Sequence, residues 1–256
     1  MTRIAINGCN GRMGQAISNL ILSDAEGQYD CTVVYGIDVV DTVSNPYPVF
    51  ASVSDVPADM SVDCIIDFSH FSVVRSIIEF AISRSTPIVV ATTGITAEDK
   101  LFMQEASKQI PLFYAANYSI GICVLKDLVR RASLLLGESF DVEIVEKHHN
   151  KKLDAPSGTA LALADAVNEA NDDKYEYIYD RHPRSAKRAK TEIGISSVRG
   201  GNIIGDHDVI FAGENEVIEL SHKAMSRCVF ANGAIRAAVY LADKPAGSYN
   251  MESMLS

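Results

Sequence analysis

The segment TRIAINGCNGRMG, residues 2–14, joins a short apolar run to three regularly spaced glycines. Residues 2–7 predict a buried strand, and the run from Gln15 to Leu22 has the periodicity of a helix. A strand, a glycine loop and a helix in this order form the context that a dinucleotide-binding fingerprint requires. The spacing is G-x-x-G-x-x-G rather than G-x-G-x-x-G, so a plain strand-to-helix turn is the alternative.

Each glycine of this loop has its own expected role. Gly8 allows the tight turn, Gly11 lets a phosphate approach the backbone, and Gly14 lets the helix pack closely on the strand. The loop therefore predicts a nucleotide site at the end of the first strand.

The second predicted strand, Cys31 to Ile37, ends at Asp38, where a carboxylate can accept a hydrogen bond from a ribose 2′-hydroxyl. Residues 39–41, Val-Val-Asp, offer no cation to a 2′-phosphate, which the carboxylate of Asp38 would also repel. We therefore expect NADH to be preferred, with NADPH possible because Arg12 could partly compensate. An ordinary turn residue is the alternative for Asp38.

Strands continue to alternate with helices as far as residue 118, and this alternation predicts a doubly wound parallel sheet. Residues 41–61, with three prolines, are expected to form a loop. The strands are predicted at 62–68, 87–91 and 111–115, and the helices at about 70–83 and 97–108. Ligands bind at the carboxyl ends of such strands. The candidates to line a cofactor groove there are His70, Thr92, Thr93, Asn117 and Tyr118, each of which taken alone is more typical of a loop.

The pattern changes at Ser119. A long apolar helix at 120–136 and a second helix at 158–170 accompany consecutive strands, which predicts an α+β domain with a mixed or antiparallel sheet. The strands are expected at 140–145, 193–198, 202–211 and 216–221. A final helix at 227–241 returns to the first domain, so we expect a dinucleotide-binding domain of residues 1–118 with 227–256, and a substrate-binding and oligomerisation domain of residues 119–226. The basic run at 181–190 is interpreted as a solvated loop, with attraction of an acidic substrate as the alternative.

Residues 146–161, EKHHNKKLDAPSGTAL, concentrate proton carriers and cations beside a predicted helix start. Free backbone N–H groups at a helix N-terminus attract an anion, and histidine exchanges protons near neutral pH. The combination suits proton transfer to a small acidic substrate. A solvated strand edge followed by an ordinary N-cap is the alternative. Neighbouring strand residues point to opposite faces, so joint metal binding by His148 and His149 is not expected.

Composition narrows the class of protein. The 256 residues are 47% hydrophobic, with a net charge of -10 that argues against bulk nucleic-acid binding. No apolar run reaches the roughly 20 residues that cross a membrane, and the N-terminal residues do not resemble a signal peptide. The five cysteines are scattered and form no C-x-x-C pair. We expect a cytoplasmic protein without disulfides, a structural metal or a membrane partner.

Several segments together resemble the bacterial 4-hydroxy-tetrahydrodipicolinate reductase family, the dihydrodipicolinate reductases of lysine and diaminopimelate biosynthesis. The resemblance runs nearly from end to end. The matching segments are 8–14, 67–69, 92–94, 115–119, 146–149 with 152–160, Arg199-Gly200-Gly201, Gly205-Asp206-His207, and 221–224 with Arg227. The run around His148 and Lys152 is close to diagnostic.

The resemblance implies the roles of particular residues. His148 is similar to the general acid of the family, Lys152 to its positively charged partner, and His149 to a substrate-contacting histidine. Gly158 and Thr159 resemble the main-chain cradle of a substrate carboxylate. The implied cofactor-binding residues are Gly8, Cys9, Asn10, Gly11, Arg12, Met13, Asp38, Ala91, Thr92, Thr93, Ala115, Ala116, Asn117 and Tyr118.

The same resemblance implies a small dicarboxylate substrate and a homotetramer built through the second domain's sheet. The chain departs from some members at His70 and Phe71, where arginine and proline are found. Two other functions stay open: another Rossmann-domain oxidoreductase of a small carboxylated substrate, and a non-catalytic NADH-binding regulator that would have no use for the histidine cluster.

Overall fold

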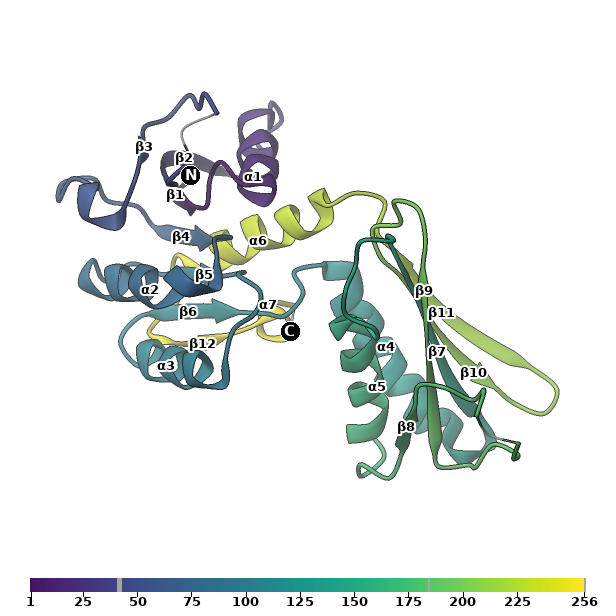
Figure 1. Ribbon diagram of the computed structural model, residues 1–256. Coiled ribbons are helices and arrows are strands. Elements are labelled where there is room, and N and C mark those ends of the chain that lie inside the picture. The colour runs from purple at the N-terminus through teal and green to yellow at the C-terminus, as the bar shows by residue number, and fades with distance from the viewer. Residues whose placement is uncertain (41–42, 184, 256) are drawn as a thin grey trace. The chain divides into compact units, whose positions relative to one another are not determined.

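Figure 1 shows a computed structural model of the chain, which describes residues 1–40, 43–183 and 185–255. Asp41, next to the end of the second predicted strand, and Arg184, in the basic run, lie outside the described residues. The chain divides into two compact units. Unit 1 combines Met1–Ser119 with Arg227–Ser256, and unit 2 is Ile120–Ser226.

Unit 1 is built on a seven-stranded sheet in the order β12-β6-β5-β4-β1-β2-β3. All neighbouring strands pair in parallel, which confirms the predicted Rossmann-like, doubly wound sheet. The strands are β1 (Thr2–Asn7), β2 (Cys31–Ile37), β3 (Val49–Phe50), β4 (Cys64–Asp67), β5 (Ile88–Val90), β6 (Pro111–Tyr114) and β12 (Gly247–Tyr249). The chain leaves β1 toward β2 on one side and returns through β4 on the other. The carboxyl ends of β1 and β4 therefore form the switch point where ligands bind in such sheets.

Helices cover both faces of this sheet, because right-handed crossovers that run in opposite directions from β1 place their helices on opposite sides. One pair in contact is α1 (Arg12–Leu22) with α6 (Cys228–Leu241), and the other is α2 (Val74–Ser83) with α3 (Ala97–Ser107). α7 (Met251–Leu255) closes the chain, and short 3₁₀ turns occupy Val53–Asp55 (η1) and Phe71–Val73 (η2). α6 lies very close to the sheet's loops: a Cβ at Gly233 would lie 1.7 Å from the carbonyl oxygen of Tyr118.

Three elements of unit 1 were not expected from the sequence. β3 lies within the predicted loop and pairs with β2 through Gly36 and Ile37. Its two residues are too short to show any periodicity. β12 and α7 likewise occupy short segments after the final helix. The helix predicted from His70 begins instead at Val74, after η2, whose N-cap is the His70 side chain.

Unit 2 has a five-stranded sheet in the order β11-β10-β7-β9-β8. β10 pairs antiparallel with β7 and β11, whereas β9 pairs parallel with β7 and β8, so the predicted second α+β domain with a mixed sheet is confirmed. The elements are α4 (Ile120–Leu136), η3 (Gly137–Ser139), β7 (Asp141–His148), α5 (Gly158–Glu169), β8 (Glu176–Ile178), β9 (Glu192–Arg199), β10 (Asp206–Ala212) and β11 (Val217–Lys223). α4 and α5 pack together on one face, where Val129, Ile144, Leu163 and Phe211 are core residues.

The described residues of the basic run form a largely exposed loop, as interpreted, but two arginines tie it to the sheet. Arg181 donates to Glu143 and to Glu192 at 2.7 Å each. Arg188 donates to Glu143 at 3.1 Å and to Asp141 at 2.9 Å. The charges of both arginines are thus compensated by carboxylates of β7 and β9.

Candidate active site

The glycine loop after β1 folds around two close backbone contacts. Gly8 has a φ of +79°, and a Cβ there would lie 2.7 Å from the carbonyl oxygen of Phe68. A Cβ at Gly14 would lie 2.2 Å from the carbonyl oxygen of Gly8. Gly11 is the N-cap of α1, and Gln15 donates to its carbonyl oxygen at 2.9 Å. Only glycine fits at Gly8 and Gly14, so the loop stays tight against the helix start.

Asp38 joins this loop to the end of β2. Its two carboxylate oxygens accept backbone N–H groups, one from Asn10 at 2.9 Å and one from Val40 at 2.9 Å. The Asn10 side chain in turn donates to the carbonyl oxygen of Val40. Val39 is 85% exposed and brings no charge to the strand end. A ribose hydroxyl would therefore meet a fixed carboxylate here, as a dinucleotide-binding site requires.

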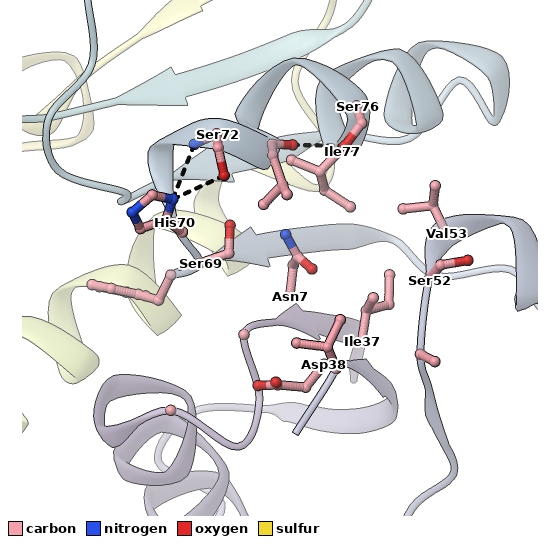
Figure 2. A pocket seen from close by; sticks show the side chains of 16 residues that line it. Asn7, Ile37, Asp38, Ser52, Val53, Ser69, His70, Ser72, Ser76 and Ile77 are labelled. Carbon is pink, nitrogen blue, oxygen red and sulfur yellow. Dashed lines mark hydrogen bonds between the residues drawn. The ribbon is translucent and has the colours of Figure 1, made fainter. Parts of the chain in front are cut away.

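A pocket of about 570 Å³ opens beside these residues (Figure 2). Side chains from β1, β2, η1 and the first turns of α2 surround the same space. Gly8, Gly11, Asp38 and His70 are the lining residues that the sequence had indicated. The others are Asn7, Ile37, Val39, Ala51, Ser52, Val53, Phe68, Ser69, Ser72, Val73, Ser76 and Ile77. The lining from residues 51–53 was missed because the strand that positions it, β3, gave no sequence signal.

Asp67 lies at the end of β4, next to Phe68 and Ser69 of the pocket lining. It is fully buried and accepts from Asn7 Nδ2 at 2.8 Å, Ser69 Oγ at 2.6 Å and Thr92 Oγ1 at 2.8 Å. Burial raises the pKa of Asp67, and the hydrogen bonds from Ser69, Thr92 and Asn7 oppose this rise. The carboxyl group thereby ties the ends of β1, β4 and β5 together.

The remaining predicted cofactor residues differ in how their side chains are placed. Tyr118 is buried and donates its hydroxyl to the carbonyl oxygen of Val90 at 2.7 Å. Cys9 is also buried, and burial together with the charge of Asp38 raises the pKa of its thiol to about 11. Ala91 and Thr92 are buried, Asn10, Met13, Ala115 and Asn117 are half-buried, and Arg12, Thr93 and Ala116 are exposed.

In unit 2, the histidine cluster begins inside a strand. The prediction ended this strand at Val145, but β7 continues to His148 because residues 146–148 pair with β9 and β10. Alternate residues of β7 face the helices: Val142 and Ile144 belong to the core, and Glu146 and His148 continue the same buried row. The buried charge of Glu146 is tolerated there because Arg199, from a distant part of the chain, pairs with it, and His148 pairs with Glu146 itself.

Glu146 is fully buried and is surrounded by donors. Arg199 binds it in a bidentate manner, at 2.8 Å to Oε2 and 2.7 Å to Oε1. The backbone N–H of Ser157 donates to Oε1 at 3.1 Å, and Nδ1 of His148 lies 2.6 Å from Oε2. Burial alone would raise the pKa of Glu146, but the hydrogen bonds, above all those from Arg199, lower it to about 2. Glu146 is therefore a carboxylate throughout the physiological pH range.

His148 itself is buried, and its pKa is lowered by desolvation, although Glu146 opposes this effect. The charges of Lys152 and Arg199 lower it further. An anionic ligand placed beside Lys152 would favour the protonated imidazole, because it adds the opposite charge. The site can thus gain its proton together with an acidic substrate.

The N-terminus of α5 lies beside this pair. Ser157 is the N-cap and accepts from the backbone N–H of Ala160 at 3.1 Å, and its hydroxyl lies 3.0 Å from Nε2 of His207. Apart from its chain neighbours and the backbone of its own helix, no described atom lies within 4 Å of the position that a Cβ on Gly158 would occupy. The first turn of a helix and the positive end of its dipole attract anions, so the start of α5 is a candidate place for one.

Lys152 and His149 complete the cluster. Lys152 is 21% exposed and forms an ion pair of 2.8 Å with Asp154. Nδ1 of His149 is buried and has no hydrogen-bond partner among the described residues. The structure thus gathers His148, Lys152 and the α5 N-terminus in one neighbourhood, with Glu146, Arg199, Ser157 and His207 as partners to which the sequence had assigned no role.

Within the described ranges, no group of three or more His, Cys, Asp or Glu side chains is arranged to hold a metal ion. Nor does any helix in that part of the chain have the length and apolarity to cross a membrane.

Comparison with known proteins matches both units to the same protein family. The family model described as "Dihydrodipicolinate reductase, N-terminus" matches residues 2–118, and the one described as "Dihydrodipicolinate reductase, C-terminus" matches residues 121–255. A 4-hydroxy-tetrahydrodipicolinate reductase of Clostridium perfringens is 47% identical over 257 residues, which cover 100% of this chain and 98% of the relative. One from Caldanaerobacter subterraneus is 46% identical over 255 residues with the same coverage of both chains.

Among solved structures, a dipicolinate-bound dihydrodipicolinate reductase from Paenisporosarcina sp. TG-14 has a similar fold. The TM-score is 0.79 at 24% identity, over 98% of this chain and 97% of the other. The NAD complex of GenD2, from gentamicin A biosynthesis, has a TM-score of 0.64 at 12% identity, over 99% of this chain and 90% of the other.

Proposed function

The chain belongs to the dihydrodipicolinate reductase family, and from this premise we propose that it reduces 4-hydroxy-tetrahydrodipicolinate to tetrahydrodipicolinate in lysine and diaminopimelate biosynthesis. The single observation that supports this most directly is the buried Glu146–His148 pair beside Lys152 and the N-terminus of α5. A regulator that only bound NADH would have no use for this cluster.

The reaction needs a hydride, a proton and a place for two carboxylates. The nicotinamide dinucleotide supplies the hydride when it is bound. The protein's own residues do the rest: Lys152 and His149 hold one side of the dicarboxylate, and the N–H groups of Gly158 and Thr159 hold a carboxylate at the helix end. The substrate's 4-hydroxyl group and a proton of the neighbouring ring carbon leave as water, which gives the unsaturated ring that the hydride reduces. His148 then gives its proton to the ring carbon that carries excess electron density after hydride transfer. The donor returns to its neutral form and is reprotonated from solvent.

The cofactor is held by the glycine loop and Asp38. The loop from Gly8 to Met13 receives the pyrophosphate, and residues 91–93 and 115–118 lie at strand ends on the same edge of the sheet. NADH is the preferred reductant and NADPH a weaker one. The carboxylate of Asp38, held by two backbone N–H groups, accepts a ribose hydroxyl and repels a 2′-phosphate, while the exposed Val39 supplies no compensating cation.

The enzyme acts in the cytoplasm as a homotetramer that forms through the sheet of unit 2. Two features support the assembly: α4 and α5 contact the sheet on one face, and the other face of β11 carries alternating exposed residues from Val217 to Lys223.

The test is turnover. Wild-type protein is given NADH and freshly prepared product of the preceding synthase, and the loss of reduced nicotinamide absorbance is followed. Lys152→Ala should be nearly inactive, whereas Lys151→Ala, which removes an exposed neighbouring lysine, should retain activity. Absence of turnover by a folded, NADH-binding wild type would refute the proposed reaction and favour the regulator or a different carboxylated substrate.

A further inference from the structure

We propose that Glu146 is a positioning residue that holds neutral His148 as its Nδ1–H tautomer, so that Nε2 is the atom that delivers the proton. The statement that Nε2 delivers the proton rests on the proposed function. The statement that Nδ1 of neutral His148 carries the proton does not depend on any reaction. Glu146 acts through His148 and does not touch the substrate.

The first argument is the hydrogen-bond pattern. Oε2 of Glu146 lies 2.6 Å from Nδ1 of His148. An ionised carboxylate only accepts hydrogen bonds, so the nitrogen that faces it must carry a proton. In neutral His148 the other nitrogen, Nε2, then carries the lone pair, and in the imidazolium it carries the proton that can leave.

The second argument is that the main groups that keep Glu146 ionised cannot change roles, although the Ser197 hydroxyl, which also bonds to it, can. The Arg199 guanidinium donates to both oxygens, and the Ser157 backbone N–H donates to Oε1. Both are obligatory donors. With the carboxylate fully buried, these bonds fix its orientation as well as its charge. The same Ser157 caps α5, so the pair is positioned relative to the helix end that we assign to a substrate carboxylate.

The third argument concerns the far side of the imidazole. A Cβ at Gly205 would lie 3.0 Å from Nε2 of His148, so any larger residue would crowd this atom. His207 meets the His148 ring edge-on with centroids 5.2 Å apart, and its own Nε2 lies within hydrogen-bond distance of Ser157. The charged and titratable groups that influence His148 are thus Glu146, Lys152, Arg199 and His207.

The variant Glu146→Gln separates positioning from simple structural support. If the glutamine NH₂ group took the place of Oε1, it would face two donors, from Arg199 and Ser157, to which it cannot hydrogen-bond. If the NH₂ group took the place of Oε2, it would face only one Arg199 nitrogen. In that position it could donate to Nδ1 of His148, provided that the imidazole moves its proton to Nε2. The second arrangement is the less unfavourable one, so the variant should reverse the tautomer. The charge-assisted bond to the imidazolium is also lost, which should lower the pKa of His148 by roughly one unit or more.

The experiment is a pH titration of protein with ¹⁵N-labelled histidine, followed by NMR without substrate, with the His148 signals identified by their loss in His148→Gln. Wild type and Glu146→Asp, which keeps a carboxylate, should show neutral His148 with its proton on Nδ1. Glu146→Gln should show it on Nε2. Neutral wild-type His148 protonated at Nε2 would overturn the proposal even if Glu146→Gln fails to fold, and so would an unchanged tautomer in folded Glu146→Gln.

Kinetics give the second readout. Because activity requires protonated His148, kcat falls as the pH rises through its pKa in the substrate complex. In Glu146→Gln this fall should occur roughly one pH unit lower, with NADH binding unchanged. A role confined to folding would lower kcat at all pH values without moving the profile, and that result would overturn the proposal. Failure of the proposed reaction can be told apart from failure of the proposed role of Glu146, because the tautomer is measured without turnover. An inactive wild type with the Nδ1–H tautomer would refute the reaction but not the positioning of His148 by Glu146.

Discussion

Gly205 packs directly against the imidazole of His148: a Cβ added to the glycine would lie 3.0 Å from Nε2 and 3.4 Å from Cδ2. The glycine stands just before β10, next to the strand that carries His148. Its lack of a side chain therefore leaves room for the Nε2 edge of the ring, from which we propose that the proton is delivered.

Gly205→Ala should lower kcat by about 10-fold to 100-fold, because the added methyl group displaces the imidazole and small misplacements of a catalytic group are costly. NADH binding should be unchanged. Gly200→Ala is the matched control, since its added methyl group meets no described atom within 4 Å other than those of its chain neighbours. Steady-state kinetics on both variants check the prediction, and equal losses in the two would contradict it.

His148→Gln should lower kcat by roughly 10²-fold to 10⁴-fold, the range lost with a general acid, and leave the affinity for NADH nearly unchanged. Titration of NADH into the variant and a single-turnover measurement test the two halves separately. His182→Gln, at an exposed histidine, is the control. A large loss of NADH affinity in His148→Gln would remove this residue from the substrate side.

The double variant Asp38→Asn with Val39→Arg should raise the ratio of kcat/KM for NADPH to that for NADH by about 10-fold or more, since the change removes a repulsion and adds an attraction worth at least ~1.4 kcal/mol together. Asparagine keeps one acceptor for the N–H groups of Asn10 and Val40. A flat ratio would show that the end of β2 does not select the cofactor.

The pH dependence of folding should report the Glu146–Arg199 pair. The pKa of Glu146 is lowered from 4.5 to about 2 in the folded state, so its stabilising contribution is complete above about pH 4.5 and is lost as the pH falls toward 2. The contribution is on the order of 3 kcal/mol. Urea unfolding of wild type and Glu146→Gln at several pH values from 6 to 2.5 measures it.

In that experiment the free energy of unfolding of wild type should exceed that of Glu146→Gln at pH 6, and the difference should shrink as the pH falls. Other carboxylates with lowered pKa values, such as Asp154 and Asp208, are common to both proteins and cancel in the comparison. A difference that stays constant with pH would mean that the charge of Glu146 does not stabilise the fold.

The sequence predicted the elements that carry strong local patterns. The glycine loop, the parallel strands around it and the long apolar helix of residues 120–136 all have periodicity or turn chemistry that is visible within about 20 residues. β3 and β12 were missed because strands of two or three residues have no period, and they form only by pairing with β2 and β6.

The sequence predicted the residues proposed to contact the substrate, but not the partners that hold them in place. His148, Lys152 and the helix start are contiguous in sequence, whereas Arg199 and His207 reach Glu146 and Ser157 from about 50 positions away. Local polarity made the segment after Val145 look like the end of a strand. The burial of Glu146 depends on a distant arginine, which no local pattern reveals.

Unit 1 is assembled from two stretches of chain that are separated by the whole of unit 2. α6, which contacts β4, β5 and β6, belongs to the later stretch, as does the edge strand β12. On the ribosome, residues 1–119 therefore emerge without the helix that covers one face of their sheet, while residues 120–226 form a continuous unit that can fold as soon as it is released. Synthesis of unit 1 thus begins first, but its fold can be completed only after unit 2 has been made. A chain that stalls before residue 227 would present the uncovered apolar face of β4 to β6 to chaperones and proteases.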